Sequence, residues 1–404
     1  MRKIFLTFLI TLVLINYACE ADSRASKSQN ISYFEKETKI EKIPSRIKII
    51  LENSKEVTLN FTQDSLLILN TRDGYQKHFY VKKIRISSSN IYINDSIYID
   101  NITSLHSNEN DVDFTIEDSA YKGKLYVYFD KDFKVLLEMP LLEYIKGLIN
   151  GEMPQTFEKD YILIQTILSY TYFLYKYLYN KKKGLEYTPL ISELEQKFIY
   201  KKVDRMSGHI EKVYGYILTY NRTVFPPFYH STCGGMTDSA YETFKDERWL
   251  NILPLKGGIK CNFCENSPHY RWKFKMDRVT VKKLFYPQCN NEISIVRKEI
   301  TSWGNITKIE LYCNDILQKI YNVFDFRTKT GRRRLKSYNF VVEKKGEDFV
   351  FSGRGFGHRV GLCQYGANEM LRLGYSYQEI LNYYYPGSRL IKLEDVGDTL
   401  VFPQ

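Results

Sequence analysis

The chain has 404 residues, and its hydrophobic content of 44% is ordinary for a globular protein. Its formal net charge of +11 at pH 7 favours an anionic partner, such as nucleic acid, anionic lipid or an acidic cell-wall polymer. Because many of the lysines are scattered, an ordinary solvated surface explains the charge equally well.

The N-terminus has the design of a bacterial export signal. A basic start precedes an apolar run from Ile4 to Ile15, which is too short and wrongly flanked for a membrane span. An alanine before Cys19 resembles a lipoprotein processing site. We therefore expect residues 1–19 to be a lipoprotein-type signal with Cys19 lipidated; ordinary cleavage nearby is the alternative. Either way we expect an exported chain, and a lipid would anchor it to a membrane on the periplasmic or cell-wall side.

A tether and a β-rich region follow the signal. Residues 20–45 are polar and without periodicity, which is typical of a spacer. Residues 46–120 are expected to form a β-rich N-terminal region, and strand-like patterns continue to about residue 135. Runs such as HFYVKKIRIS and NIYINDSIYI are rich in β-branched and aromatic residues and are bounded by Asn, Asp and Ser.

The periodicity becomes helical at Pro140. LLEYIKGLIN places its apolar residues on one stripe, and a second helix is expected from Lys159 to about Lys181. Polar residues interrupt this second helix, so its apolar middle indicates a buried helix and not a membrane span. The tetrapeptide GEMP, residues 151–154, then becomes an elbow between two buried helices. Its Glu152 is either an ordinary surface charge in a turn between helices, or a carboxylate whose placement is the reason that the turn exists.

The remainder of the chain mixes strands, loops and helices. Residues 230–275 form a loop region rich in Cys and Gly, and strands are expected to resume over 292–345. The C-terminal segment reads as a glycine-rich loop followed by helices broken at Gly374 and at Pro386-Gly387. The whole pattern predicts an α+β fold of mixed strands and buried helices that form a cleft.

Cysteine spacing leaves two alternatives open. Cys261 and Cys264 have the Cys-x-x-Cys spacing that is half of many zinc sites. Cys233, Cys363 or His269 could complete a tetrahedral structural zinc site. Disulfides among these cysteines are equally compatible with an exported protein.

Two glycine-containing motifs carry histidines. HSTCGGMTDSA, residues 230–240, is a tight donor-rich loop that either lines a sugar or peptide site or is a decorated turn. GRGFGHRVG, residues 353–361, lacks the spacing and context of a dinucleotide loop. Its His358 is either a polar group on the floor of a cleft or a structural histidine.

The basic run GRRRLK, residues 331–336, superficially resembles a nucleic-acid patch. The sequence around it holds no recognisable nucleic-acid module, and the chain is expected to be exported. A solvated turn, or contact with an anionic glycan, is the better interpretation, and no nucleic-acid partner is expected.

Three separated segments together resemble the stage II sporulation protein D and amidase-enhancer family. Their order and distances also agree with that family, over roughly residues 120 to 392. We therefore expect a domain of this type at 121–392, followed by a tail at 393–404. The segments are LYVYFDKDFKVLLEMPLLEYIKGLINGEMPQTF, HSTCGGMTDSAYETF and GRGFGHRVGLCQYGANEMLRLGYSYQEILNYYYPGSRL.

The resemblance implies peptidoglycan remodelling. The sporulation members are lytic transglycosylases that cleave the bond between N-acetylmuramic acid and N-acetylglucosamine to a 1,6-anhydro product, and their catalytic acid falls on Glu152. Other members are non-catalytic enhancers of a cell-wall amidase. The implied partners are glycan strands and such an amidase, and no cofactor is required. The residues expected to line the cleft with Glu152 are His230, Ser231, Thr232, Gly234, Gly235, His358 and Gln364.

The sequence also departs from the family. Arg359 stands where the family has a glycine, and Ile167, Leu168 and Tyr170 stand where it has small alanines and an arginine. Some members bind zinc through Cys and His between the second helix and the His-Ser-Thr loop. Here the stretch ISELEQKFIYKK, residues 191–202, has neither, so that site does not carry over and a metal would have to use the cysteines at 261 and 264. We expect Glu152 to lie in an open cleft near His230 and His358.

Overall fold

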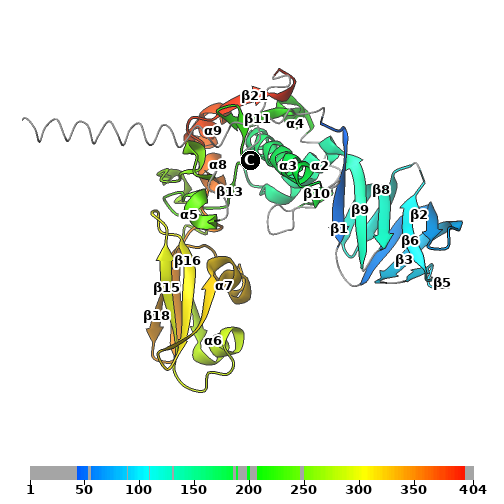
Figure 1. The fold of residues 1–404 in the computed structure, drawn as a ribbon. Coiled ribbons are helices and arrows are strands. Elements are labelled where there is room, and N and C mark those ends of the chain that lie inside the picture. The colour runs from blue at the N-terminus through cyan, green and yellow to red at the C-terminus, as the bar shows by residue number, and fades with distance from the viewer. Residues whose placement is uncertain are drawn as a thin grey trace, which may run out of the picture.

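The structure is a computed structural model. It describes residues 43–52, 56–88, 90–108, 110–129, 132–184, 188–189, 198–200, 207–245 and 250–395. The expected signal with Cys19, and the tether up to residue 42, lie outside the described residues. The described chain forms an N-terminal sheet, a central helical body and a lower lobe, which follow one another in Figure 1.

The N-terminal sheet has ten strands in the order β10-β1-β9-β8-β6-β2-β3-β4-β5, with β7 against β2 and β8. Its strands alternate buried and exposed side chains, because one face covers the core and the other meets solvent. The sheet continues beyond residue 120 through β8 and β9, and the expected strands at 78–87 and 90–99 are confirmed as β3 and the β4–β5 hairpin. The strands are β1 (Arg46–Glu52), β2 (Glu56–Thr71), β3 (Gln76–Ser87), β4 (Ile91–Ile93), β5 (Ile97–Ile99), β6 (Ile102–Ser107), β7 (Val112–Ile116), β8 (Ser119–Phe129), β9 (Phe133–Pro140) and β10 (Thr188–Pro189).

Helices α2 (Leu141–Glu152) and α3 (Tyr161–Lys182) connect the sheet to the central body. The expected apolar stripe of α2 is buried, and Pro140 precedes its first turn. Every residue of α3 from Tyr161 to Tyr175 is buried, which explains its continuous apolar middle. The part of the chain that the structure describes has no helix long and apolar enough to cross a membrane.

The central body is built around α3. Two short strands, β13 and β20, pair in parallel and place Tyr229 beside Leu362 and His230 beside Cys363. Two sequence segments 130 residues apart therefore meet at one point. The elements are α4 (Ser207–Val213), β11 (Tyr216–Tyr220), β12 (Thr223–Val224), β13 (Tyr229–His230), α5 (Ala240–Phe244), η3 (Leu253–Leu255), η4 (Asn262–Cys264), β20 (Leu362–Cys363), α8 (Gln364–Arg372), α9 (Tyr377–Tyr384), β21 (Arg389–Lys392) and η5 (Leu393–Asp395).

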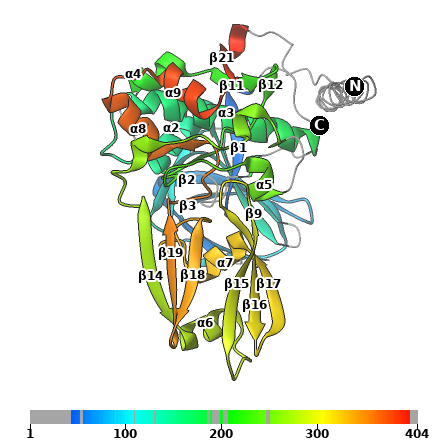
Figure 2. The same ribbon diagram turned by 90° about the vertical axis from the view of Figure 1, so that its left-hand side faces the viewer.

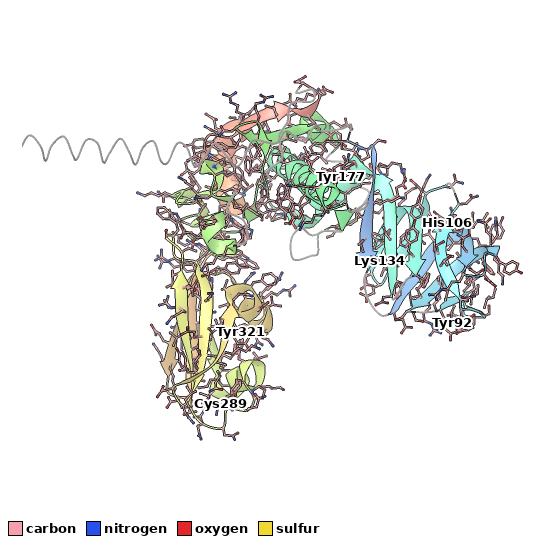
Figure 3. All side chains as sticks on the ribbon, viewed as in Figure 1. Tyr92, His106, Lys134, Tyr177, Cys289 and Tyr321 are labelled. Atoms are coloured by element: carbon pink, nitrogen blue, oxygen red, sulfur yellow. A yellow bond between two sulfur atoms is a disulfide. The ribbon has the colours of Figure 1, made fainter. Side chains whose placement is uncertain are left out.

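The lower lobe, residues 271–354, has its own hydrophobic core of buried aromatics such as Phe326 and Phe351. Two three-stranded sheets, β14-β19-β18 and β15-β16-β17, stand next to each other with α6 and α7 (Figure 2). A disulfide joins Cys289, labelled at the far end of the lobe in Figure 3, to Cys313. The elements are β14 (Arg271–Asp277), α6 (Arg278–Phe285), β15 (Ile293–Ile300), β16 (Ile306–Cys313), β17 (Ile316–Asn322), α7 (Val323–Thr330), β18 (Phe340–Lys345) and β19 (Asp348–Arg354).

The α+β prediction is confirmed, with one omission inside the lobe. Strands were expected over 292–345, and α7 interrupts them. The Asn322 side chain caps this short helix by accepting a hydrogen bond from the backbone N–H of Asp325. Val323, Phe326 and Thr330 lie on the buried face of this helix. Eight residues give too few turns for a clear helical period, so only the cap could have signalled α7.

Candidate functional site

The GEMP elbow occurs where it was expected, between α2 and α3. Glu152 is the last residue of α2 and is half-buried. The backbone N–H of Met153 closes the helix by donating to the carbonyl oxygen of Ile149 (3.0 Å). Phe157, buried in the turn that follows, contacts the ring of Tyr161 edge-on with centroids 5.0 Å apart. The carboxylate is therefore carried by a helix end that packs on apolar side chains.

The start of α8 meets this elbow. Gln364 Nε2 donates to the backbone carbonyl oxygen of Glu152 (3.3 Å) and to Gln165 Oε1 (3.3 Å). The Tyr161 hydroxyl also donates to Gln165 Oε1 (3.3 Å). Burial raises the pKa of Tyr161 well above its usual value, and the nearby Glu152 charge contributes in the same direction. Gln364 thus links the C-terminal motif to the residue expected to be the catalytic acid.

Two neutral histidines lie near the start of α8: His230 is paired with Cys363, the residue before Gln364, and His358 contacts His230. His230 is buried; its Nδ1 donates to the Val360 carbonyl oxygen (3.0 Å), and its Nε2 has no partner among the described residues. Burial lowers the pKa of His230 to about 4. His358 accepts the backbone N–H of Val360 at Nδ1 (3.0 Å), and burial lowers its pKa well below the usual value, with a further contribution from His230. The two rings are 5.7 Å apart, so these two predicted residues do lie together.

The other predicted residues of the His-Ser-Thr loop hold the loop in place. Thr232 is fully buried, and its hydroxyl lies 2.6 Å from that of Ser267. Ser231 is half-buried and accepts the backbone N–H of Tyr365 at its carbonyl oxygen (3.1 Å). Gly234 has φ +72°, and a Cβ there would lie 2.7 Å from the Cβ of Arg354. Gly235 has φ +110°.

The four cysteines gather in one buried cluster. The sulfur atoms of Cys233, Cys261, Cys264 and Cys363 all lie within 4.8 Å of one another, and all four thiols are free. His269 lies outside the cluster, with Nδ1 3.2 Å from Nζ of Lys336. The sequence did not single out the pair that forms the disulfide in the lower lobe.

An aromatic cavity lies between α3 and the lower lobe, with a volume of about 720 Å³. Of the predicted site residues, its lining includes His358 alone, so a single open cleft holding Glu152, His230 and His358 is not shown. Sequence reasoning missed the tyrosines of α3, whose spacing at positions 172, 175 and 179 was the available signal. The aromatic and basic lining residues are Tyr172, Tyr175, Tyr179, Phe228, Tyr229, Phe244, Phe324, Tyr338, Lys176, Lys245 and Lys308.

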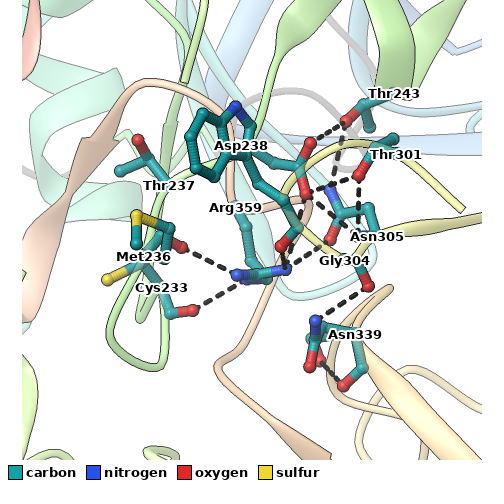
Figure 4. Close-up of polar contacts among 12 residues, drawn as sticks. Cys233, Met236, Thr237, Asp238, Thr243, Thr301, Gly304, Asn305, Asn339 and Arg359 are labelled. Carbon is teal, nitrogen blue, oxygen red and sulfur yellow. Dashed lines mark hydrogen bonds and ion pairs between the residues drawn. The ribbon is translucent and has the colours of Figure 1, made fainter. Parts of the chain in front are cut away.

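Arg359 connects the loop that contains Cys233 and Met236 to Asn305 of the lower lobe, as Figure 4 shows. Its guanidinium is buried; it donates to the carbonyl oxygens of Cys233 (2.8 Å) and Met236 (2.9 Å) and to Asn305 Oδ1 (3.0 Å), and lies 3.5 Å from Asp238. Burial raises the pKa of Asp238 and lowers that of Arg359. The backbone of Arg359 has φ +64°, the left-handed region that favours glycine.

Comparison with known proteins identifies similar sequences. A family model described as "Stage II sporulation protein" matches residues 129–220, which span β9 to β11 and include the elbow. The chain is 27% identical over 301 residues to an uncharacterized protein of Brachyspira hyodysenteriae, covering 70% of this chain and 76% of that protein. It is 24% identical over 269 residues to stage II sporulation protein D of Bacillus subtilis, covering 62% and 74%. It is also 24% identical over 289 residues to an amidase enhancer of Bacillus subtilis, covering 61% of this chain but 40% of that protein.

Proposed function

We propose that the chain remodels peptidoglycan as a lytic transglycosylase with Glu152 as its catalytic acid and base. Its similarity to stage II sporulation protein D and to an amidase enhancer supports the proposal. The observation that carries the proposal is the contact of Gln364 with Glu152. It joins the elbow to the C-terminal motif, and β13 and β20 add the His-Ser-Thr loop. Two segments far apart in sequence thereby meet at the elbow, and β20 connects them to the His-Ser-Thr loop.

A single carboxylate is sufficient for this chemistry. Ordinary glycosidases need two, one as acid and one as base or nucleophile. Here protonated Glu152 would donate its proton to the glycosidic oxygen as the bond from that oxygen to C1 of N-acetylmuramic acid breaks. The 6-hydroxyl of the same sugar would then bond to C1 and return its proton to Glu152, so no water is consumed. The product is a 1,6-anhydro sugar and the acid is regenerated.

Apolar residues flank Glu152 along the chain, which supports the proposed role of this residue as an acid. Ile149 is fully buried, Phe157 is nearly so, and Met153 packs on two hydrophobic clusters. Apolar neighbours disfavour a charged carboxylate, which is how a glutamate becomes a useful general acid near neutral pH.

The aromatic cavity supports a place for the glycan. Flat aromatic side chains offer stacking faces for sugar rings, and Lys176, Lys245 and Lys308 offer positive charge for the carboxylates of muramic acid and stem peptides. His358 lines the cavity and contacts His230, which connects this region to the strand pair beside Gln364. We assign the cavity to glycan binding.

A non-catalytic glycan-binding role is the second candidate. The relative named amidase enhancer and the absence of Glu152 from the lining of the aromatic cavity both favour it. In that case the cavity would hold glycan while a separate cell-wall amidase performs the chemistry.

We further propose that the protein acts outside the cytoplasm, anchored by a lipid on Cys19. The basic and apolar N-terminal run before this cysteine supports the assignment. Palmitate labelling and its loss in Cys19→Ser test it, and unchanged labelling would contradict it.

The enzymatic proposal is tested by incubating the folded chain with peptidoglycan, with and without stem peptides, and analysing products by mass spectrometry. We expect 1,6-anhydro-muramyl products from the parent and none from Glu152→Gln, with glycan binding retained. Glu143→Gln is the matched control, because Glu143 lies on the same helix in an ion pair with Lys146. Glycan binding without anhydro products from the parent would support the enhancer role.

A further inference from the structure

The clustered cysteines come from three separate segments. Cys233 belongs to the His-Ser-Thr loop, Cys261 precedes η4, Cys264 is the last residue of η4, and Cys363 is the last residue of β20. Each is at most 1% exposed. Folding has therefore brought four sulfur atoms to one interior point, although hydrophobic packing alone needs no thiol at any of these positions.

The dimensions of the cluster suit one metal ion. A tetrahedral zinc with bonds of about 2.3 Å to four thiolates holds the sulfur atoms about 3.8 Å apart. Here all four sulfur atoms lie within 4.8 Å of one another, and those of Cys233 and Cys264 are 3.5 Å apart. These separations are non-bonded, so the four thiols are not arranged as two disulfides. Oxidised cysteines occur elsewhere in the same chain, at Cys289–Cys313.

Neighbouring groups are placed as a metal-bound thiolate requires. The backbone N–H of Cys233 donates to Cys363 Sγ (3.3 Å), and the Tyr384 hydroxyl lies 3.1 Å from Cys261 Sγ. At Gly366 in α8 a Cβ would lie 2.6 Å from Cys261 Sγ and 2.2 Å from the Tyr384 hydroxyl. Glycine is therefore needed there so that the helix can approach the sulfur atoms.

We propose that Cys233, Cys261, Cys264 and Cys363 bind one structural zinc ion. All four positions are occupied by protein sulfur, which is the closed coordination of a structural site. The ion clamps the His-Ser-Thr loop and the strand that leads into Gln364 to the η4 turn. The inference does not depend on the proposed enzymatic activity, since its measurements are of metal and thiols.

The first test is the metal content of the purified full chain after expression with zinc. We expect one zinc per chain by elemental analysis. Replacing it with Co²⁺ should give the thiolate-to-metal charge-transfer absorption of a tetrahedral sulfur site. Alkylation in denaturant with a chelator and no reductant should label these four cysteines and leave the lobe disulfide intact, as located by peptide mapping.

Paired variants separate the cluster from the disulfide. Cys261→Ser combined with Cys264→Ser should lose zinc, whereas Cys289→Ser combined with Cys313→Ser should retain one ion per chain. A control that does not depend on the folding of the first variant is treatment of the parent with a zinc chelator. The chelator should lower the melting temperature, and returning zinc should restore it. Disulfides among the four cysteines, a metal-free chain after zinc incubation, or iron in place of zinc would each overturn the proposal.

Discussion

The backbone conformation of Arg359 favours glycine, whereas the contacts of its side chain favour arginine. The backbone adopts a left-handed φ of +64°, where glycine would be more comfortable by about 1 kcal/mol. The buried guanidinium, however, faces the buried carboxylate of Asp238 and donates to Asn305. The arginine that replaces the glycine of the resembled family is therefore part of a buried network of polar contacts.

We predict that Arg359→Gly destabilises the protein in spite of the relieved backbone. Removing one partner of a buried ion pair costs about 3–5 kcal/mol, so the net loss should be about 2–4 kcal/mol. Denaturant unfolding measures it. In the double variant with Asp238→Asn, the loss should be smaller than the sum of the single losses. A variant as stable as the parent would show that the pair contributes nothing.

At the scale of elements, α3 serves the sheet core and the cavity at once. Its buried middle packs on the hydrophobic clusters, while Tyr172, Tyr175 and Tyr179 line the cavity at helical spacing. Tyr179 is half-buried and stacks on Tyr175 with ring centroids 6.1 Å apart. The helix thus presents an aromatic row where we place the glycan.

We predict that Tyr179→Ala weakens binding of soluble glycan fragments about fivefold, since an aromatic stacking contact contributes about 1 kcal/mol. Isothermal titration measures the affinity. Tyr80→Ala is the control, because Tyr80 lies 71% exposed on β3, outside the cavity lining. Equal affinities of the parent and Tyr179→Ala would remove the cavity from the glycan path.

The predictable elements are those with a repeating local signal. The strands of the N-terminal sheet and the apolar stripe of α2 follow from alternation and helical periodicity. The tyrosines of α3 were predicted only as core, because the cavity beside them exists only once the lower lobe is in place. The pairing of His230 with Cys363 likewise depends on a β13–β20 contact that no local pattern encodes.

At the scale of the whole molecule, the aromatic cavity depends on how the lower lobe is held. Its lining combines α3 with lobe residues such as Lys308 and Phe324. Glu299 of the lobe forms ion pairs with both Lys245 of the central body and Lys308, and Glu242 accepts the backbone N–H of Ser302 (2.6 Å). Two carboxylates therefore join the lobe to the body, and Glu299 also forms ion pairs with two of the lysines that line the cavity.

The two lysines lower the pKa of Glu299 to about 2, mainly through hydrogen bonds from Lys245 and then Lys308. A carboxyl whose pKa is lower in the folded state stabilises the fold above its unfolded value of about 4.5, and this contribution disappears as the pH falls towards about 2. We predict that acidification across this window loosens the lobe, and that Glu299→Gln removes that part of the pH dependence.

Unfolding midpoints measured at about pH 5.5 and about pH 2.5 test the prediction, with the parent losing more stability than Glu299→Gln. Glu347→Gln is the matched control, because the ion pair of Glu347 with Arg278 stays within the lobe. The same acid response in Glu299→Gln as in the parent would show that the lobe is held by other contacts.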